Sequence, residues 1–104
     1  AQQVIDIVPK FSYFLPNAFT PNGDGKNDVY MGKGYFQYIS NFEMNIYNRW
    51  GERIYTNNSP SDSWNGRKNN TGERCQAGVY VVVVRFSGPR GEKQEIKGFA
   101  TIVY

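Results

Sequence analysis

Residues 79–87, Val-Tyr-Val-Val-Val-Val-Arg-Phe-Ser, constrain the fold more than any other part of the chain. β-Branched and aromatic residues fill this run, which is the composition of a β-strand. Successive side chains of a strand point to opposite faces. One face would carry Val79, Val81 and Val83, and the other would carry Tyr80, Val82, Val84 and Phe86. Because both faces are apolar, the run predicts a central strand that is covered on two sides.

Turn signals divide the chain into short segments, and they predict a hairpin over residues 42–56. Residues 42–46 alternate apolar and polar side chains, as a half-buried strand does, and residues 52–56 form its partner. Between them, Asn48 and Gly51 fit the first and fourth positions of a type I turn followed by a glycine bulge. A second turn is expected after residue 87, because Pro89 stands at the second position of a Gly-Pro-Arg-Gly sequence.

The remaining segments also favour strands and loops. β-Prone runs cover residues 4–8 and 11–15, and a last strand or strand pair covers residues 92–104, with a kink at Gly98. Residues 57–78 are rich in Asn, Ser, Gly and Thr, which predicts long loops with one short strand at Trp64. No window shows sustained helical periodicity. We therefore expect an all-β fold, an immunoglobulin-like antiparallel β-sandwich of about seven strands.

The stretch from Phe14 to Tyr30, FLPNAFTPNGDGKNDVY, is a loop framed by aromatic residues. Its middle resembles a calcium loop of the D-x-N-x-D-G type, with oxygen ligands from Asn22, Asp24, Asp28 and the backbone carbonyl of Lys26. Such a Ca²⁺ site is half built, because Thr20 and Met31 stand where Asp and Glu belong, unless Asp62 or another distant carboxylate completes it. The alternative is an Asx-rich turn whose side chains satisfy its own backbone. We expect that no cofactor is required, and Ca²⁺ binding stays open.

The residue types present argue against catalysis. The chain has no histidine and one cysteine, Cys75. A serine or cysteine nucleophile activated by histidine therefore cannot form, and neither can a disulfide within the chain. We expect that the protein is not an enzyme and that Cys75 is inert.

The net charge of +3 comes from scattered Lys and Arg residues, so no nucleic-acid partner is expected. No apolar run reaches the roughly 18–20 residues of a membrane helix, so no transmembrane segment is expected either.

Several motifs together resemble one family. They are Leu15 to Asp28 (LPNAFTPNGDGKND), Ile46 to Gly51 (IYNRWG), Trp64 to Gly66, Ala77 to Tyr80 and Lys97 to Phe99, in that order. The chain is similar to the gliding motility-associated C-terminal domain, the type B sorting domain of the type IX secretion system. The resemblance covers residues 13–104, and residues 1–12 would be a lead-in strand or the end of a preceding domain. The family often has Pro-Leu-Pro where this chain has Arg-Cys-Gln at 74–76, which places Cys75 at an apolar site.

The resemblance implies a secretion signal. Such domains end large secreted proteins, including surface adhesins, so a cargo fused to the N-terminal side is expected. The cargo would cross the inner membrane and the periplasm, and the folded domain would be recognised by the type IX machinery and a PorP/SprF-like outer-membrane barrel. The expected location is the cell surface or the outside of the cell. Recognition would use the edge strand 95–104 and the loop 17–28, since an edge strand can pair with a partner.

The residues expected to contact a partner lie in these two segments and at the tip of the predicted hairpin. They are Asn17, Phe19, Thr20, Asn22, Asp24, Asp28, Arg49, Trp50, Lys97, Phe99, Ile102, Val103 and Tyr104. Two alternatives remain. One is a carbohydrate-binding or adhesive module whose platform would draw on Trp50, Trp64, Tyr35, Phe36, Tyr38 and Tyr47. The other is a structural immunoglobulin-like spacer.

Overall fold

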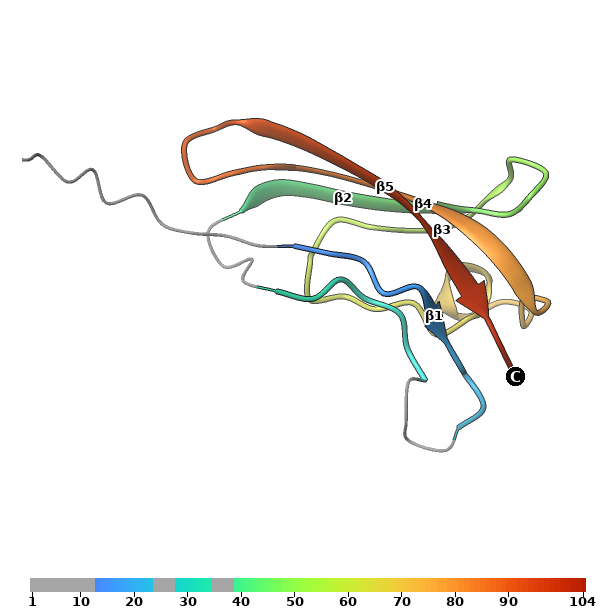
Figure 1. Ribbon diagram of the computed structural model, residues 1–104. Coiled ribbons are helices and arrows are strands. Elements are labelled where there is room, and N and C mark those ends of the chain that lie inside the picture. Colours follow the sequence, from blue (N-terminus) through green and yellow to red (C-terminus); the bar gives the residue numbers. More distant parts are fainter. Residues whose placement is uncertain (1–12, 24–27, 35–38) are drawn as a thin grey trace, which may run out of the picture.

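A computed structural model describes residues 13–23, 28–34 and 39–104 of the chain (Figure 1). These residues contain no α-helix, and their strands form one sheet in the order β1-β5-β4-β2-β3. The all-β fold class is therefore confirmed. The elements are β1 (Ala18–Phe19), β2 (Ser40–Tyr47), β3 (Arg53–Asn57), the 3₁₀ turn η1 (Lys68–Asn70), β4 (Gly78–Ser87) and β5 (Lys93–Ile102).

Two hairpins build most of the sheet, and the same kind of turn closes both. In the β2–β3 turn, the N–H of Gly51 donates to the carbonyl of Asn48 over 3.0 Å. In the β4–β5 turn, the N–H of Gly91 donates to the carbonyl of Gly88 over the same distance. Both fourth-position glycines have a φ of 82°, which a residue with a side chain adopts only with strain. Both predicted turns are confirmed.

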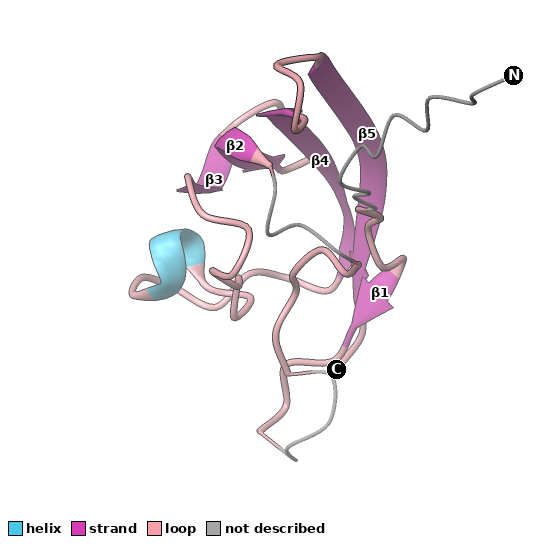
Figure 2. Cartoon of the chain, turned by 90° about the vertical axis from the view of Figure 1, so that its left-hand side faces the viewer, coloured by secondary structure: helices cyan, strands magenta, loops and turns pink. Residues whose placement is uncertain are grey.

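β4 is central in the sheet, as predicted, but only one of its faces is covered. Tyr80, Val82, Val84 and Phe86 are buried on the inner face. Val81 and Val83 are only half-buried on the other face, and Val79 is 54% exposed there. Figure 2 shows the loops of the domain gathered on one side of the curved sheet. The predicted coverage on two sides is therefore wrong, and we call the uncovered side the open face.

The layer that covers the sheet consists of loops, so a sandwich of seven strands is not confirmed. Short bridges replace strands in this layer: Phe14 pairs with Lys33, and Tyr30 pairs with Trp64. The predicted strand at residues 11–15 is reduced to the Phe14 bridge within the described part of the chain, and the run 4–8 lies outside it. The sheet is also mixed rather than antiparallel, because β1 pairs parallel to β5. Pro16 and Pro21 flank β1 and lack an N–H donor, which limits its length.

Trp64 is the centre of the core between the loop layer and the sheet. Its ring is fully buried, and its centroid lies 5.2 Å from that of Phe19, 5.4 Å from that of Tyr80 and 6.2 Å from that of Tyr55. The indole N–H donates to the carbonyl of Arg67 over 2.8 Å, so the one polar atom of the ring is satisfied. Phe19 and Tyr30 of the loop 14–30 both pack into this core, whereas Phe14 at the start of the loop is 58% exposed.

Candidate recognition surface

Exposed apolar side chains gather at one end of the sheet. Among the described residues, seven large hydrophobic side chains are exposed, and five of them lie in the β2–β3 turn, at the start of β4, near the end of β5 and in the two residues that follow β5. They are Trp50, Val79, Phe99, Val103 and Tyr104, which we call the Trp50 patch. Trp50 is 73% exposed and Phe99 is 65% exposed. An apolar cluster of this kind on a small domain is typical of an interaction site.

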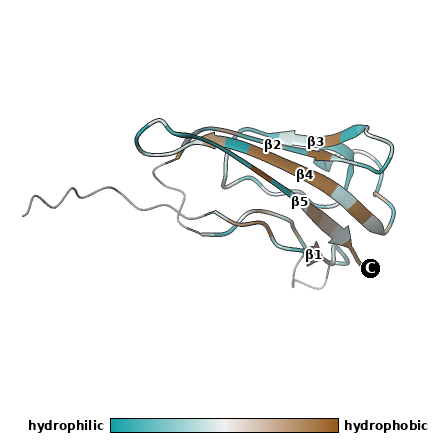
Figure 3. Cartoon of the chain, turned by 45° about the horizontal axis from the view of Figure 1, so that its top comes forward, coloured by the Kyte–Doolittle hydropathy of each residue, from teal (hydrophilic) through white to brown (hydrophobic). Residues whose placement is uncertain are grey.

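The register of the sheet brings the members of the patch together. Val79 pairs with Thr101, and Val81 pairs with Phe99, so Val79 and Phe99 are diagonal neighbours on the open face. Figure 3 shows hydrophobic residues along β4 and hydrophilic residues at the β4–β5 turn, which lies at the opposite end of these strands. The apolar surface is therefore concentrated at the end of the sheet where the chain terminates.

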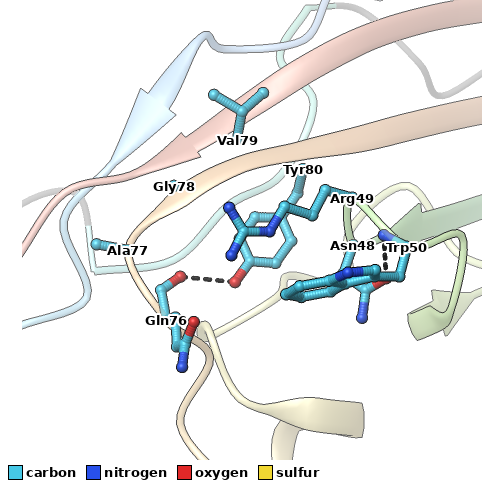
Figure 4. Close-up of a pocket in the computed structure, with 8 residues that line it drawn as sticks. All are labelled: Asn48, Arg49, Trp50, Gln76, Ala77, Gly78, Val79 and Tyr80. Atoms are coloured by element: carbon cyan, nitrogen blue, oxygen red, sulfur yellow. Dashed lines mark hydrogen bonds between the residues drawn. The ribbon is translucent and has the colours of Figure 1, made fainter.

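The β2–β3 turn holds Trp50 in a defined position. The side-chain oxygen of Asn48 accepts hydrogen bonds from the N–H groups of Trp50 and Glu52, each over 3.0 Å. The guanidinium carbon of Arg49 lies 4.3 Å from the centroid of the Trp50 ring. Figure 4 shows the Arg49 and Trp50 side chains beside Tyr80 and Gln76. The turn thus presents an exposed indole on a rigid base.

Trp50 lies between two hollows. The smaller one, of about 50 Å³, is bounded by Arg49 and by the chain from Gln76 to Tyr80. Its floor is held by the Tyr80 hydroxyl, which donates to the carbonyl of Gln76 over 2.6 Å. The larger hollow, of about 230 Å³, lies on the side of Arg74 and Cys75. Both are smaller than the 300–1,000 Å³ typical of small-molecule pockets, so they suit single side chains of a partner.

The last residues of the chain are fastened to this end of the domain. The hydroxyl of Tyr104 donates to the carbonyl of Cys75 over 2.5 Å, and the guanidinium carbon of Arg74 lies 3.8 Å from its ring centroid. The N–H of Val103 donates to the carbonyl of Phe19 over 3.1 Å, which extends the β1–β5 pairing. The C-terminal end is therefore a fixed part of the surface.

Cys75 contributes packing to this region. Its side chain is half-buried against the core, and burial raises the pKa of the Cys75 thiol. A raised pKa lowers the fraction of thiolate, which is the reactive form. The geometry agrees with the interpretation of Cys75 as an inert residue.

The charged residues of the open face mostly form ion pairs. Glu95 accepts a hydrogen bond from the Arg85 guanidinium over 2.8 Å, and the Lys97 ammonium lies 3.3 Å from its other oxygen. These contacts, the first above all, lower the pKa of the Glu95 carboxyl. In contrast, Arg49 and Arg74 contact aromatic rings, and within the described part of the chain neither forms an ion pair.

The structure separates the residues expected to meet a partner into three groups. Arg49, Trp50, Phe99, Val103 and Tyr104 come together in or beside the Trp50 patch. Phe19 and Ile102 are 3% and 1% exposed, so their side chains belong to the core. The third group lies along β1, its loop and the middle of β5: Asn17, Thr20, Asn22, Asp28 and Lys97, whereas Asp24 lies outside the described residues. Val79 and Arg74 belong to the surface but were not expected there.

The candidate calcium ligands are only partly described, since Asp24 and Lys26 lie outside the described residues. One oxygen of Asp28 accepts a hydrogen bond from the N–H of Gly23 over 3.0 Å. Asn22 donates its own N–H to the carbonyl of Thr20 over 2.9 Å. The bond from Gly23 to the Asp28 side chain is of the kind that the Asx-rich turn predicts, whereas the bond from Asn22 to Thr20 joins two backbone groups.

We expect the melting temperature of the purified domain to be the same in EDTA and in millimolar calcium chloride. Asp28→Ala should lower it by a few degrees in both buffers, because the exposed hydrogen bond from Gly23 is lost and a typical intramolecular hydrogen bond contributes about 1 kcal/mol. In a domain of this size, 1 kcal/mol corresponds to about 4–8 °C. Differential scanning calorimetry measures both effects, with Glu73→Ala as a control at an exposed carboxylate in another loop. A calcium-dependent rise that Asp28→Ala abolishes would instead identify a metal site.

The aromatic platform of the carbohydrate alternative does not form in the described part of the chain. Trp64 is buried and Tyr47 is half-buried, while Tyr35, Phe36 and Tyr38 lie outside the described residues. Trp50 alone of the described candidates is exposed. A row of rings on one face, which sugar stacking would need, is therefore not observed among them.

The comparison with protein families decides the assignment. The model of the CHU_C type IX secretion signal domain matches residues 13–102, which is most of the chain. The chain belongs to this family. Proteins with such a signal domain are exported to the cell surface or to the outside of the cell, and the signal implies contact with the type IX machinery. Signal domains of this family are not known as catalytic domains. No curated protein matches the chain.

Two further observations accompany the assignment. No helix among the described residues combines the length and the apolar composition needed to cross a membrane. No three metal-ligating side chains of the His, Cys, Asp and Glu types cluster in the described part of the chain. The Trp50 patch is thus the main feature of the described surface of this secretion signal domain.

Proposed function

We propose that the domain is the C-terminal secretion signal of a larger cargo protein and that the type IX machinery reads it as a folded module. The observation that carries this proposal is the family match over residues 13–102. The Trp50 patch supports it, because a signal read by protein partners needs an exposed surface of aromatic and apolar side chains. The role requires binding and no catalysis.

The proposal includes a route. The cargo crosses the inner membrane, passes through the periplasm and meets an outer-membrane barrel of the PorP/SprF type. This partner contacts the end of the domain at which β5 terminates, since Phe99, Val103 and Tyr104 are exposed there. A folded domain with a preformed surface would bind without the entropy cost of ordering a disordered tail.

An export assay tests the proposal. Residues 1–104 are fused behind a fluorescent passenger that carries an inner-membrane export signal. The fusion is expressed with a matching barrel in a bacterium that has the type IX machinery and in a mutant that lacks it. We expect passenger on the surface or in the medium only when the machinery is present. Equal retention in the periplasm of both strains, with the domain shown to be folded, would contradict the proposal.

A further inference from the structure

Two arginine–aromatic pairs lie at the end of the domain that carries the Trp50 patch. Arg49 contacts Trp50, and Arg74 contacts Tyr104. Trp, Tyr and Arg are the residue types that contribute most binding energy in protein interfaces. The larger hollow connects the two pairs, because Trp50 and Arg74 both line it.

Some charged residues at this end have a partner of opposite charge, and others have none among the described residues. Glu52 lies 3.7 Å from the ammonium of Lys68 and so has a partner of opposite charge. Arg49 and Arg74 have none among the described residues, and a cation–π contact does not neutralise a guanidinium. A guanidinium presents several N–H donors and matches a carboxylate in geometry as well as in charge. With Lys68 paired to Glu52, the charges that remain are those of Arg49, Arg74 and Glu73, so this end keeps a net positive charge and its complement is anionic as well as apolar.

The mixture of charges favours a protein over a membrane or a nucleic acid. Glu52 and Glu73 line the same hollow as Arg74 and Lys68. A continuous negative surface of lipid headgroups or phosphates would meet these two carboxylates and be repelled. A peptide segment can place single carboxylates at the arginines and apolar side chains between them. The hollows, of about 50 and 230 Å³, also have the size of individual side chains.

We infer that the Trp50 patch binds an acidic segment of a partner protein. An apolar side chain of the segment enters the larger hollow beside Trp50, and carboxylates of the segment bind Arg49 and Arg74. This inference rests on the proposed function and specifies the chemistry of the partner. It assigns binding roles to Arg74, which lies before β4 in the sequence, and to the larger hollow, which Trp50 and Arg74 both line.

The export assay described above tests the inference with charge-reversal variants. The double variant Arg49→Glu/Arg74→Glu should lower the exported passenger about tenfold or more, because reversal places like charges across the interface. Arg49→Lys/Arg74→Lys keeps the charge and should retain most of the export. The control Lys33→Glu/Lys93→Glu changes the net charge equally at two exposed positions outside the patch and should export like the wild type.

Each outcome has a distinct meaning. If the wild-type fusion is exported and the arginine reversal is exported equally well, the inference is wrong and the proposed function stands. If the control loses as much export as the arginine variant, overall charge matters and the inference is also wrong. If the wild-type fusion is not exported, the proposed function fails and the inference fails with it. Melting temperatures of all purified variants within a few degrees of the wild type exclude unfolding as the cause.

A vesicle assay distinguishes a lipid from a protein partner. The purified domain is mixed with vesicles of phosphatidylglycerol and phosphatidylethanolamine, and the emission of Trp50 is followed. Trp64 is fully buried, so a change in accessibility to acrylamide reports on Trp50. We expect no change with vesicles. A blue shift that Arg49→Glu/Arg74→Glu abolishes would assign the arginines to lipid headgroups and overturn the inference.

Discussion

Trp64→Ala should lower the free energy of unfolding by about 3–5 kcal/mol, the range for a buried Trp or Phe replaced by alanine. Trp64 is fully buried and is surrounded by Phe19, Tyr55 and Tyr80. Its removal leaves a cavity between the loop layer and the sheet, and it leaves the carbonyl of Arg67 without its indole donor. Since a small domain has about 5–15 kcal/mol of stability in total, much of the domain should unfold at modest urea concentrations.

The second tryptophan supplies the matched control. Trp50→Ala removes the same side chain from a position that is 73% exposed, and it breaks only the contact with Arg49. An exposed contact of this kind contributes about 0.5–1 kcal/mol. Urea unfolding followed by far-UV circular dichroism compares the two variants without relying on tryptophan emission. A loss below about 1 kcal/mol for Trp64→Ala, or equal losses for both variants, would show that Trp64 does not hold the two layers together.

The two tight turns show what the sequence predicts well. The Asn-Arg-Trp-Gly and Gly-Pro-Arg-Gly turns are specified by the four residues themselves, because glycine tolerates the positive φ at the fourth position. Each turn also sets which strands are neighbours. Four of the five strands could therefore be predicted, together with the pairing of β2 with β3 and of β4 with β5 in hairpins.

The covering layer could not be predicted in the same way. Trp64 is held by the bridge to Tyr30 and by rings from distant segments, and the local periodicity of the sequence does not predict such contacts. The parallel pairing of β1 with β5 joins residues that are more than eighty positions apart in the chain. This register buries Phe19 and Ile102, which had been expected on the surface. Non-local pairings of this kind depend on the assembled fold.

The exposed Trp50 patch could be predicted only in part for a related reason. The position of Trp50 at a turn pointed to exposure. The strand 95–104 was expected at an edge of the sheet, and this is wrong for its last residues, because β1 pairs with β5 at Thr101 and Ile102. Val79 was missed because an apolar strand pattern does not distinguish a buried face from an exposed face of β-branched residues. Arg74 was not expected in the patch because its contact with the Tyr104 ring joins residues thirty positions apart in the chain.

Val82→Asp and Val83→Asp should have very different effects, although the residues are adjacent in β4. Val82 is fully buried on the inner face between Ile46 and Gly98, so a carboxylate there has no water and no partner. Burying an unpaired charge costs several kcal/mol, and we expect the variant not to fold or to be extensively unfolded. This change and Trp64→Ala have the largest effects that we expect on stability.

Val83 lies on the open face beside Lys97 of β5 and Asn45 of β2. Aspartate is a poor strand residue, which costs about 1 kcal/mol, but a cross-strand pair with Lys97 would offset part of this loss. Val83→Asp should therefore fold, with a loss of about 1 kcal/mol or less in urea unfolding. If both faces of β4 were covered, as the sequence pattern alone predicts, the two variants would fail alike. Comparable unfolding of Val83→Asp would thus show that the open face is part of a core.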